Sequence, residues 1–120
     1  MPHIVFDKKI NLVEFSKKFK PIFIKKEFLI KISTIFVDKD SLSALLPTVI
    51  ISKLHQEFFI EISTSKLKTT IRLLPISNPK KTNEVKESMM LVARQILDNY
   101  NNFKITKTNI TQVKSLMALQ

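Results

Sequence analysis

The chain contains no glycine in 120 residues, and this absence restricts its fold and chemistry more than any residue that is present. Glycine adopts left-handed backbone and lets a ligand approach the main chain closely. Phosphate-binding loops, dinucleotide-binding fingerprints and nucleophile elbows depend on it, so these three kinds of site are excluded. Cysteine is also absent, which excludes disulfides, thiolate nucleophiles and zinc–thiolate centres. We therefore expect no cofactor.

Length and hydropathy indicate one domain that spans residues 1–120. Apolar residues make up 44% of the chain, enough for a core without metal or disulfide support. No apolar run approaches the roughly 18 residues that a membrane-spanning helix needs. The first residues lack a basic segment followed by an apolar one, so we expect no signal peptide and a cytoplasmic protein.

The chain carries 20 Lys and Arg residues against 10 Asp and Glu residues, a formal net charge of +10. Such an excess favours anionic partners, although an AT-rich coding sequence also enriches lysine. Only Arg72 and Arg94 are arginines, which argues against bidentate recognition of bases or phosphates. The lysines occur in short pairs rather than in one polybasic block, which is typical of solvated surfaces.

Alternating and continuous apolar runs predict a sheet. Residues 28–37 read as a central strand because both faces are apolar, whereas Pro47 makes residues 44–51 an edge strand or an irregular extension. The other predicted strands span residues 2–7, 57–64, 69–74 and 103–110. In the strand over 57–64, Phe59 interrupts an otherwise polar face.

Three helices complete the predicted order. Asn11 and Glu14 have the spacing of a capping box for a first helix that Pro21 ends or kinks. Asn78 and Pro79 indicate the start of a long second helix, whose apolar residues recur at helical spacing up to Tyr100. A short helix begins near Thr111, with an apolar face that includes Leu119.

This order predicts an α+β two-layer sandwich: a mixed, mostly antiparallel sheet with two helices on one face and a short C-terminal helix. The strand–helix–strand stretches at either end permit right-handed crossovers between parallel strands. Because the sheet is apolar on both faces and helices cover one, we expect a homo-oligomer, another layer or a ligand on the second face.

Pro2 is the sharpest candidate for chemistry. Methionine before proline is normally removed, which would leave a secondary amine at the start of a strand. An α-amino group titrates near pH 8, so a perturbed one is suited to act as a general base at neutral pH. The alternative is that proline is simply a common second residue.

The opening Met1-Pro2-His3, the apolar strand through Phe6 and the helix that follows resemble the tautomerase superfamily, in particular the carboxymethyl-hydroxymuconate isomerase group. The resemblance implies a trimer with Pro2 as catalytic base for proton transfer in keto and enol acids. It also implies that Lys31 and Arg72 bind the substrate carboxylate. The short first helix, the long segment 38–56 and the missing loop glycines depart from the family pattern.

Other side chains suggest less. His3 and His55 do not make a metal site by themselves, and we expect none. Glu57 and Glu61 lie about 13 Å apart along one strand face, too far for a paired-carboxylate site. Two alternatives to an enzyme stay open: a nucleic-acid-binding module with a lysine-rich surface, and a non-catalytic assembly protein. The element order is similar to one repeat of the TATA-binding-protein fold, which binds DNA on its sheet.

Overall fold

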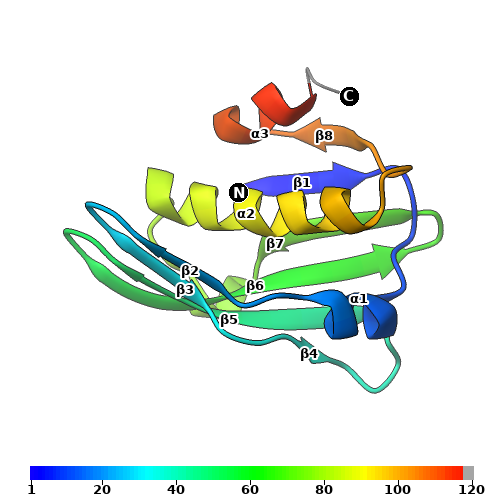
Figure 1. Cartoon of the computed structure of the whole chain (residues 1–120), viewed down its shortest axis with the longest axis horizontal. Coiled ribbons are helices and arrows are strands. Elements are labelled where there is room, and N and C mark those ends of the chain that lie inside the picture. The colour runs from blue at the N-terminus through cyan, green and yellow to red at the C-terminus, as the bar shows by residue number, and fades with distance from the viewer. Residues whose placement is uncertain (118–120) are drawn as a thin grey trace.

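The computed structural model describes residues 1–117, which form an α+β fold of eight strands, three α-helices and one 3₁₀ turn (Figure 1). In chain order the elements are β1 (His3–Phe6), α1 (Leu12–Lys18), β2 (Ile22–Lys25), β3 (Leu29–Ile32), β4 (Phe36–Val37), β5 (Ser43–Ile51), β6 (His55–Ser65), β7 (Lys68–Leu73), η1 (Pro75–Ser77), α2 (Asn83–Asn99), β8 (Ile105–Thr108) and α3 (Thr111–Met117). The predicted helix residue Leu119 lies outside the described residues.

The strands form one curled sheet in the order β2-β3-β5-β6-β7-β1-β8, with the short β4 paired to β5. Every strand pair among residues 1–117 is antiparallel. The expectation of parallel crossovers was therefore wrong, because β1 pairs with β7 and β8 rather than with β2. The chain returns to β1 only after the meander from β2 to β7, so the two ends of the chain meet at one edge of the sheet.

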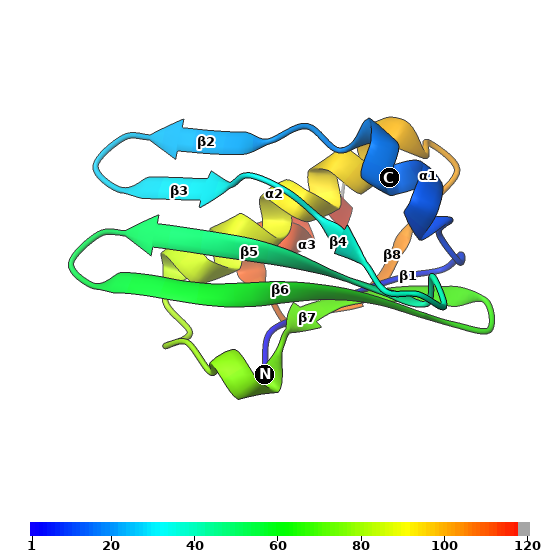
Figure 2. The same ribbon diagram turned by 90° about the horizontal axis from the view of Figure 1, so that it is seen from below.

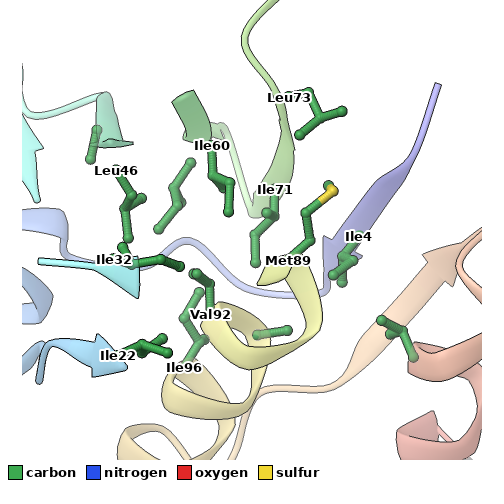
Figure 3. Packing of buried hydrophobic residues seen from close by; sticks show 14 of the residues in the cluster. Ile4, Ile22, Ile32, Leu46, Ile60, Ile71, Leu73, Met89, Val92 and Ile96 are labelled. Carbon is green, nitrogen blue, oxygen red and sulfur yellow. The ribbon is translucent and has the colours of Figure 1, made fainter. Parts of the chain in front are cut away.

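Helix α2 packs along one face of the sheet, and its apolar side chains form the centre of the core (Figures 1 and 3). The helical spacing predicted from the sequence is confirmed by the fully buried residues Val85, Met89, Val92 and Ile96. Figure 3 shows Met89 beside Ile71 of β7, and Ile96 beside Ile22 of β2. The helix thus joins strands from both halves of the sheet. It begins later than predicted, because Thr82 rather than Asn78 caps it by accepting the Val85 N–H.

Strand β5 lies in the interior of the sheet, between β3 and β6, so its assignment to an edge was wrong. Pro47 has no N–H, and the structure shows how the sheet accommodates it. The N–H and C=O of Phe59, which is opposite Pro47, bond to Ser77 and Leu74 on the other side of β6. In an antiparallel pair, the nitrogen of Pro47 therefore points away from β6, toward the gap between β3 and β4.

The same gap divides the strand predicted over residues 28–37. β3 ends at Ile32, and β4 resumes at Phe36 after three residues outside the ladder. The interruption changes the alternation, so Ile32 faces the core while Phe36 is 61% exposed on the other face. Strand β2 was not predicted from the sequence. It has only four residues, which follow directly on Pro21, and this is too short for an alternation of buried and exposed residues to be recognised.

Candidate functional site

Pro2 lies buried immediately before β1, at the corner where β1, β8 and the start of α2 meet. A hollow of about 240 Å³ opens beside it, lined by Met1, Pro2, Lys81, Lys86 and Asn109. We call this the N-terminal corner. Residues 2 and 109 are far apart in the sequence, so only the pairing of β1 with β8 brings them together. No local pattern would have predicted Lys81, Lys86 or Asn109 as neighbours of Pro2.

Hydrogen bonds hold the N-terminal corner in place. The Asn109 side chain accepts the His3 N–H at 3.1 Å and donates Nδ2–H to the Met1 carbonyl at 2.9 Å. The Nδ1 of His3 lies 3.0 Å from the same carbonyl, which can only accept, so Nδ1 carries the proton. Thr108 adds a bond of 2.7 Å from its hydroxyl to the His3 carbonyl. Two donors therefore converge on the oxygen of the peptide bond that precedes the Pro2 nitrogen.

The two lysines of the corner come from a segment that is anchored on both sides. The N–H of Lys80 donates to Gln56 Oε1 on β6 at 2.7 Å, and Thr82 caps α2. Lys81, between these anchors, donates Nζ–H to Asn78 Oδ1 at 2.9 Å. Lys86 is half-buried in the second turn of α2. The corner therefore offers two ammonium groups and a side-chain amide, a set suited to a small anion.

Lys31 and Arg72 lie elsewhere in the chain. Lys31 is on β3, four strands from β1, or about 19 Å at the usual strand spacing. Arg72 is on β7 directly opposite His3, whereas Pro2 is on the side of the sheet that the core covers, two residues before buried Ile4. The Arg72 guanidinium pairs with Glu61. Within one chain, the fold does not bring either residue together with Pro2.

Both residues belong to a sheet face that none of the helices within residues 1–117 covers (Figure 2). We call it the outer face, and its side chains on the strands from β2 to β7 include Phe23, Lys25, Leu29, Lys31, Phe36, Leu45, Pro47, Val49, Ile51, Glu57, Phe59, Glu61 and Arg72. Three of its aromatic rings are substantially exposed: Phe23 at 59%, Phe36 at 61% and Phe59 at 37%. Phe59 was the one outer-face aromatic that the alternation pointed to.

Lysines lie at both ends of the sheet. Lys25 ends β2 and Lys26 follows it in the β2–β3 turn, and Lys53 lies in the β5–β6 turn at the same end. Lys66 lies in the β6–β7 turn and Lys68 starts β7 at the other end (Figure 1). The outer face between them carries two carboxylates, Glu57 and Glu61. The described residues therefore do not gather their lysines on one surface.

A second hollow, of about 500 Å³, lies where β1 ends, beside the β6–β7 turn and β8. Val5, Phe6 and Leu67 give it an apolar lining, and Lys66 and Lys68 give it cations. Asp7 also lines it, but its carboxylate accepts the backbone N–H of Lys104 at 2.9 Å. That bond, with help from Lys8, holds the pKa of Asp7 below its usual value. The Asp7 carboxylate in this hollow thus serves to hold the backbone of Lys104.

The chain matches no protein-family model, no curated protein and no solved structure. Within residues 1–117, no three His, Asp or Glu side chains gather as metal ligands. No helix in the same range is both long enough and apolar enough to cross a membrane.

Proposed function

We propose that the N-terminal corner is the site of a tautomerase-like isomerase that transfers a proton in a keto or enol carboxylic acid. The observation that carries the proposal is the hollow that Pro2 shares with Lys81, Lys86 and Asn109. In this proposal Met1 is removed and the Pro2 nitrogen becomes a free secondary amine. Pro2 is the base, and the two lysines bind the substrate carboxylate in place of Lys31 and Arg72.

The hydrogen bonds of the corner favour a neutral amine. His3 Nδ1–H and Asn109 Nδ2–H both donate to the Met1 carbonyl, one peptide bond away from the Pro2 nitrogen. Once Met1 is gone, these donors would face the nitrogen lone pair, and a donor stabilises the neutral amine over the ammonium ion. The nearby ammonium groups of Lys81 and Lys86 act in the same direction. We expect the pKa of the Pro2 amine to fall below that of an ordinary α-amino group.

The reaction itself balances without any redox partner. The Pro2 nitrogen accepts the proton of the enol hydroxyl, which leaves an enolate. The resulting ammonium gives that proton to the far carbon of the former C=C bond, next to the carbon that bears the oxygen, and the keto acid forms. The lysines hold the carboxylate so that both positions lie near one nitrogen.

The proposal concerns the chemistry of the corner and does not depend on a parallel strand–helix–strand unit, which these strands do not form. It includes a two-layer subunit whose helices cover one face. The alternative of a nucleic-acid-binding module has less support, because lysines lie at turns at both ends of the sheet rather than on one surface.

Intact mass spectrometry of the natural protein is the first test, because retention of Met1 would rule out Pro2 as a base. The second is decay of the enol absorbance of phenylpyruvate, used as a generic enol acid. We expect Pro2→Ala to lower kcat, because it replaces the secondary amine that acts as the base with a primary amine. We expect Lys81→Gln with Lys86→Gln to raise KM at least tenfold, since two charged contacts to the carboxylate are lost.

Two further variants are the controls. Lys17→Gln with Lys20→Gln removes the same charge from exposed positions around α1 and should leave kinetics unchanged. Lys31→Gln with Arg72→Gln tests the assignment that the family resemblance implies. If this pair abolishes turnover while the corner pair does not, the corner is not the carboxylate site.

A further inference from the structure

We infer that the outer face binds a second copy of this chain, face to face, around a two-fold axis that runs along β5. This inference does not rest on the proposed isomerase activity. It starts from the exposed apolar side chains of that face. Phe23, Phe36 and Phe59 are exposed there together with Ile51, which is 46% exposed, and Leu45, Pro47 and Val49 are half-buried between them. Contiguous apolar surface of this kind marks an interaction site.

The strand register shows why the partner is a second copy. Val49 lies at the centre of a cross-strand row, with Lys31 directly opposite it on β3 and Glu57 directly opposite it on β6. The cation and the carboxylate therefore lie one strand to either side of β5, at the same height. Within residues 1–117, Lys31 forms no ion pair, and the ion pair of Glu57 is with His55 rather than with a lysine or arginine.

A two-fold axis along β5 exchanges the two sides of that strand. It places Lys31 of one copy opposite Glu57 of its partner and, by symmetry, repeats the pair on the other side. Val49 then meets Val49, and the strands of the two sheets stay aligned, which is a usual way for sheets to pack. In this row the face is thus self-complementary in charge and apolar at the axis.

The rest of the row fits the same arrangement. Phe23 lies opposite Lys31 on β2, two strands from β5. The axis carries it to the η1 side of the partner, where Leu74 and Ser77 bond to the backbone of Phe59. The η1 residue Ile76 is 89% exposed. An exposed ring on one copy therefore meets an exposed aliphatic side chain on the other.

The size of the face sets the expected affinity. From β2 to β7 it spans about 19 Å across the strands and about 30 Å along them, or roughly 600 Å² per copy. This is somewhat below the roughly 800 Å² per partner of a standard stable interface. We therefore expect a dimer with a dissociation constant in the micromolar range. The carboxylates Glu57 and Glu61 disfavour a nucleic acid on the same face.

Sedimentation velocity over a wide range of protein concentration tests the inference through a charge exchange. Lys31→Glu puts a carboxylate opposite Glu57 twice in the dimer, and Glu57→Lys puts an ammonium opposite Lys31 twice. Each change should raise the dissociation constant at least tenfold. The double variant restores opposite charges in exchanged positions and should return the constant to within about threefold of the wild-type value.

Lys107→Glu is the matched control. Lys107 is on β8, opposite Val5 of β1, at the edge of the sheet. With the two-fold axis along β5, no strand of the partner copy lies over Lys107. This variant should dimerise like the wild type. Far-ultraviolet circular dichroism shows whether each variant is folded. A wild-type protein that stays monomeric at about 0.5 mM, or a double variant as monomeric as the single ones, would overturn the inference.

Discussion

Thr69→Val tests the contact that ties the start of the chain to the sheet. Thr69 is fully buried on β7, and its hydroxyl serves two backbone groups of the β1–α1 connection. It accepts the Ile10 N–H at 2.9 Å and donates to the Lys8 carbonyl at 2.7 Å. Valine has nearly the same shape and the same β-branched preference for strands, so the change removes these two bonds and little else.

The expected loss follows from what each partner can do afterwards. Ile10 is buried, so its N–H stays without a partner, which costs about 1–3 kcal/mol. Lys8 is exposed, and its carbonyl can bond to water at a cost of at most about 1 kcal/mol. We expect Thr69→Val to lower the free energy of unfolding by about 1–4 kcal/mol. The midpoint of the urea titration should fall in proportion.

Thr48→Val is the matched control for this experiment. Thr48 is as buried as Thr69 and also lies on a strand of the sheet. Its hydroxyl makes a single bond of 3.0 Å, to the carbonyl of Leu46 in its own strand. We expect a loss below about 1 kcal/mol. Hydrogen exchange should show reduced protection of the Ile10 amide in Thr69→Val alone. If Thr69→Val costs no more than Thr48→Val, the hydroxyl does not anchor the β1–α1 connection.

Two further predictions concern one turn and one ionisation. Lys66 adopts φ 47° in the two-residue β6–β7 turn, a left-handed conformation that favours glycine. Lys66→Gly should therefore raise the free energy of unfolding by up to about 1 kcal/mol, whereas Lys68→Gly in the extended strand should lower it. Urea titrations of both variants measure the two changes. Tyr100 is the only tyrosine, and burial together with its 2.8 Å bond to Glu14 raises its pKa to about 12, so its absorbance should titrate near pH 12 when folded and near pH 10 in urea. Because the pKa of Tyr100 is higher in the folded than in the unfolded protein, the neutral phenol contributes stability that is complete below pH 10 and is lost as the pH rises toward 12. A folded protein whose tyrosine titrates at pH 10 would contradict the bond to Glu14.

Local patterns predicted much of the fold, and the failures have identifiable causes. The Asn11 cap accepts the Glu14 N–H at 3.1 Å as expected, and the apolar spacing of α2 matches its buried face. The prediction for Pro47 was wrong because proline is excluded from the interior of a sheet only where its nitrogen would have to donate a hydrogen bond. Here the pairing of β5 with β3 and β4 is interrupted opposite that nitrogen. The residues around position 47 do not reveal this interruption, because it depends on the neighbouring strands.

The candidate site was harder to predict for a related reason. Pro2 was singled out from the first residues, but its neighbours in the fold come from the segment that leads into α2, from the start of α2 and from the residue after β8. Lys31 and Arg72 were chosen from strand context, and the strand alternation turns both toward the outer face. A residue's face follows from local alternation, whereas the set of residues that share a corner depends on which strands become neighbours.

The missing glycines explain why the candidate surfaces consist of side chains. Without glycine the main chain rarely adopts left-handed backbone, and Ser41, Lys66 and Asn78 are the described residues that do so. The two candidate surfaces accordingly consist of side chains. The corner lies on the side of the sheet that the core covers, and the outer face is the other side. If the charge exchange at Lys31 and Glu57 does not restore the dimer, the proposed role of Pro2 as a base still stands. If Met1 is retained, the proposed dimer still stands.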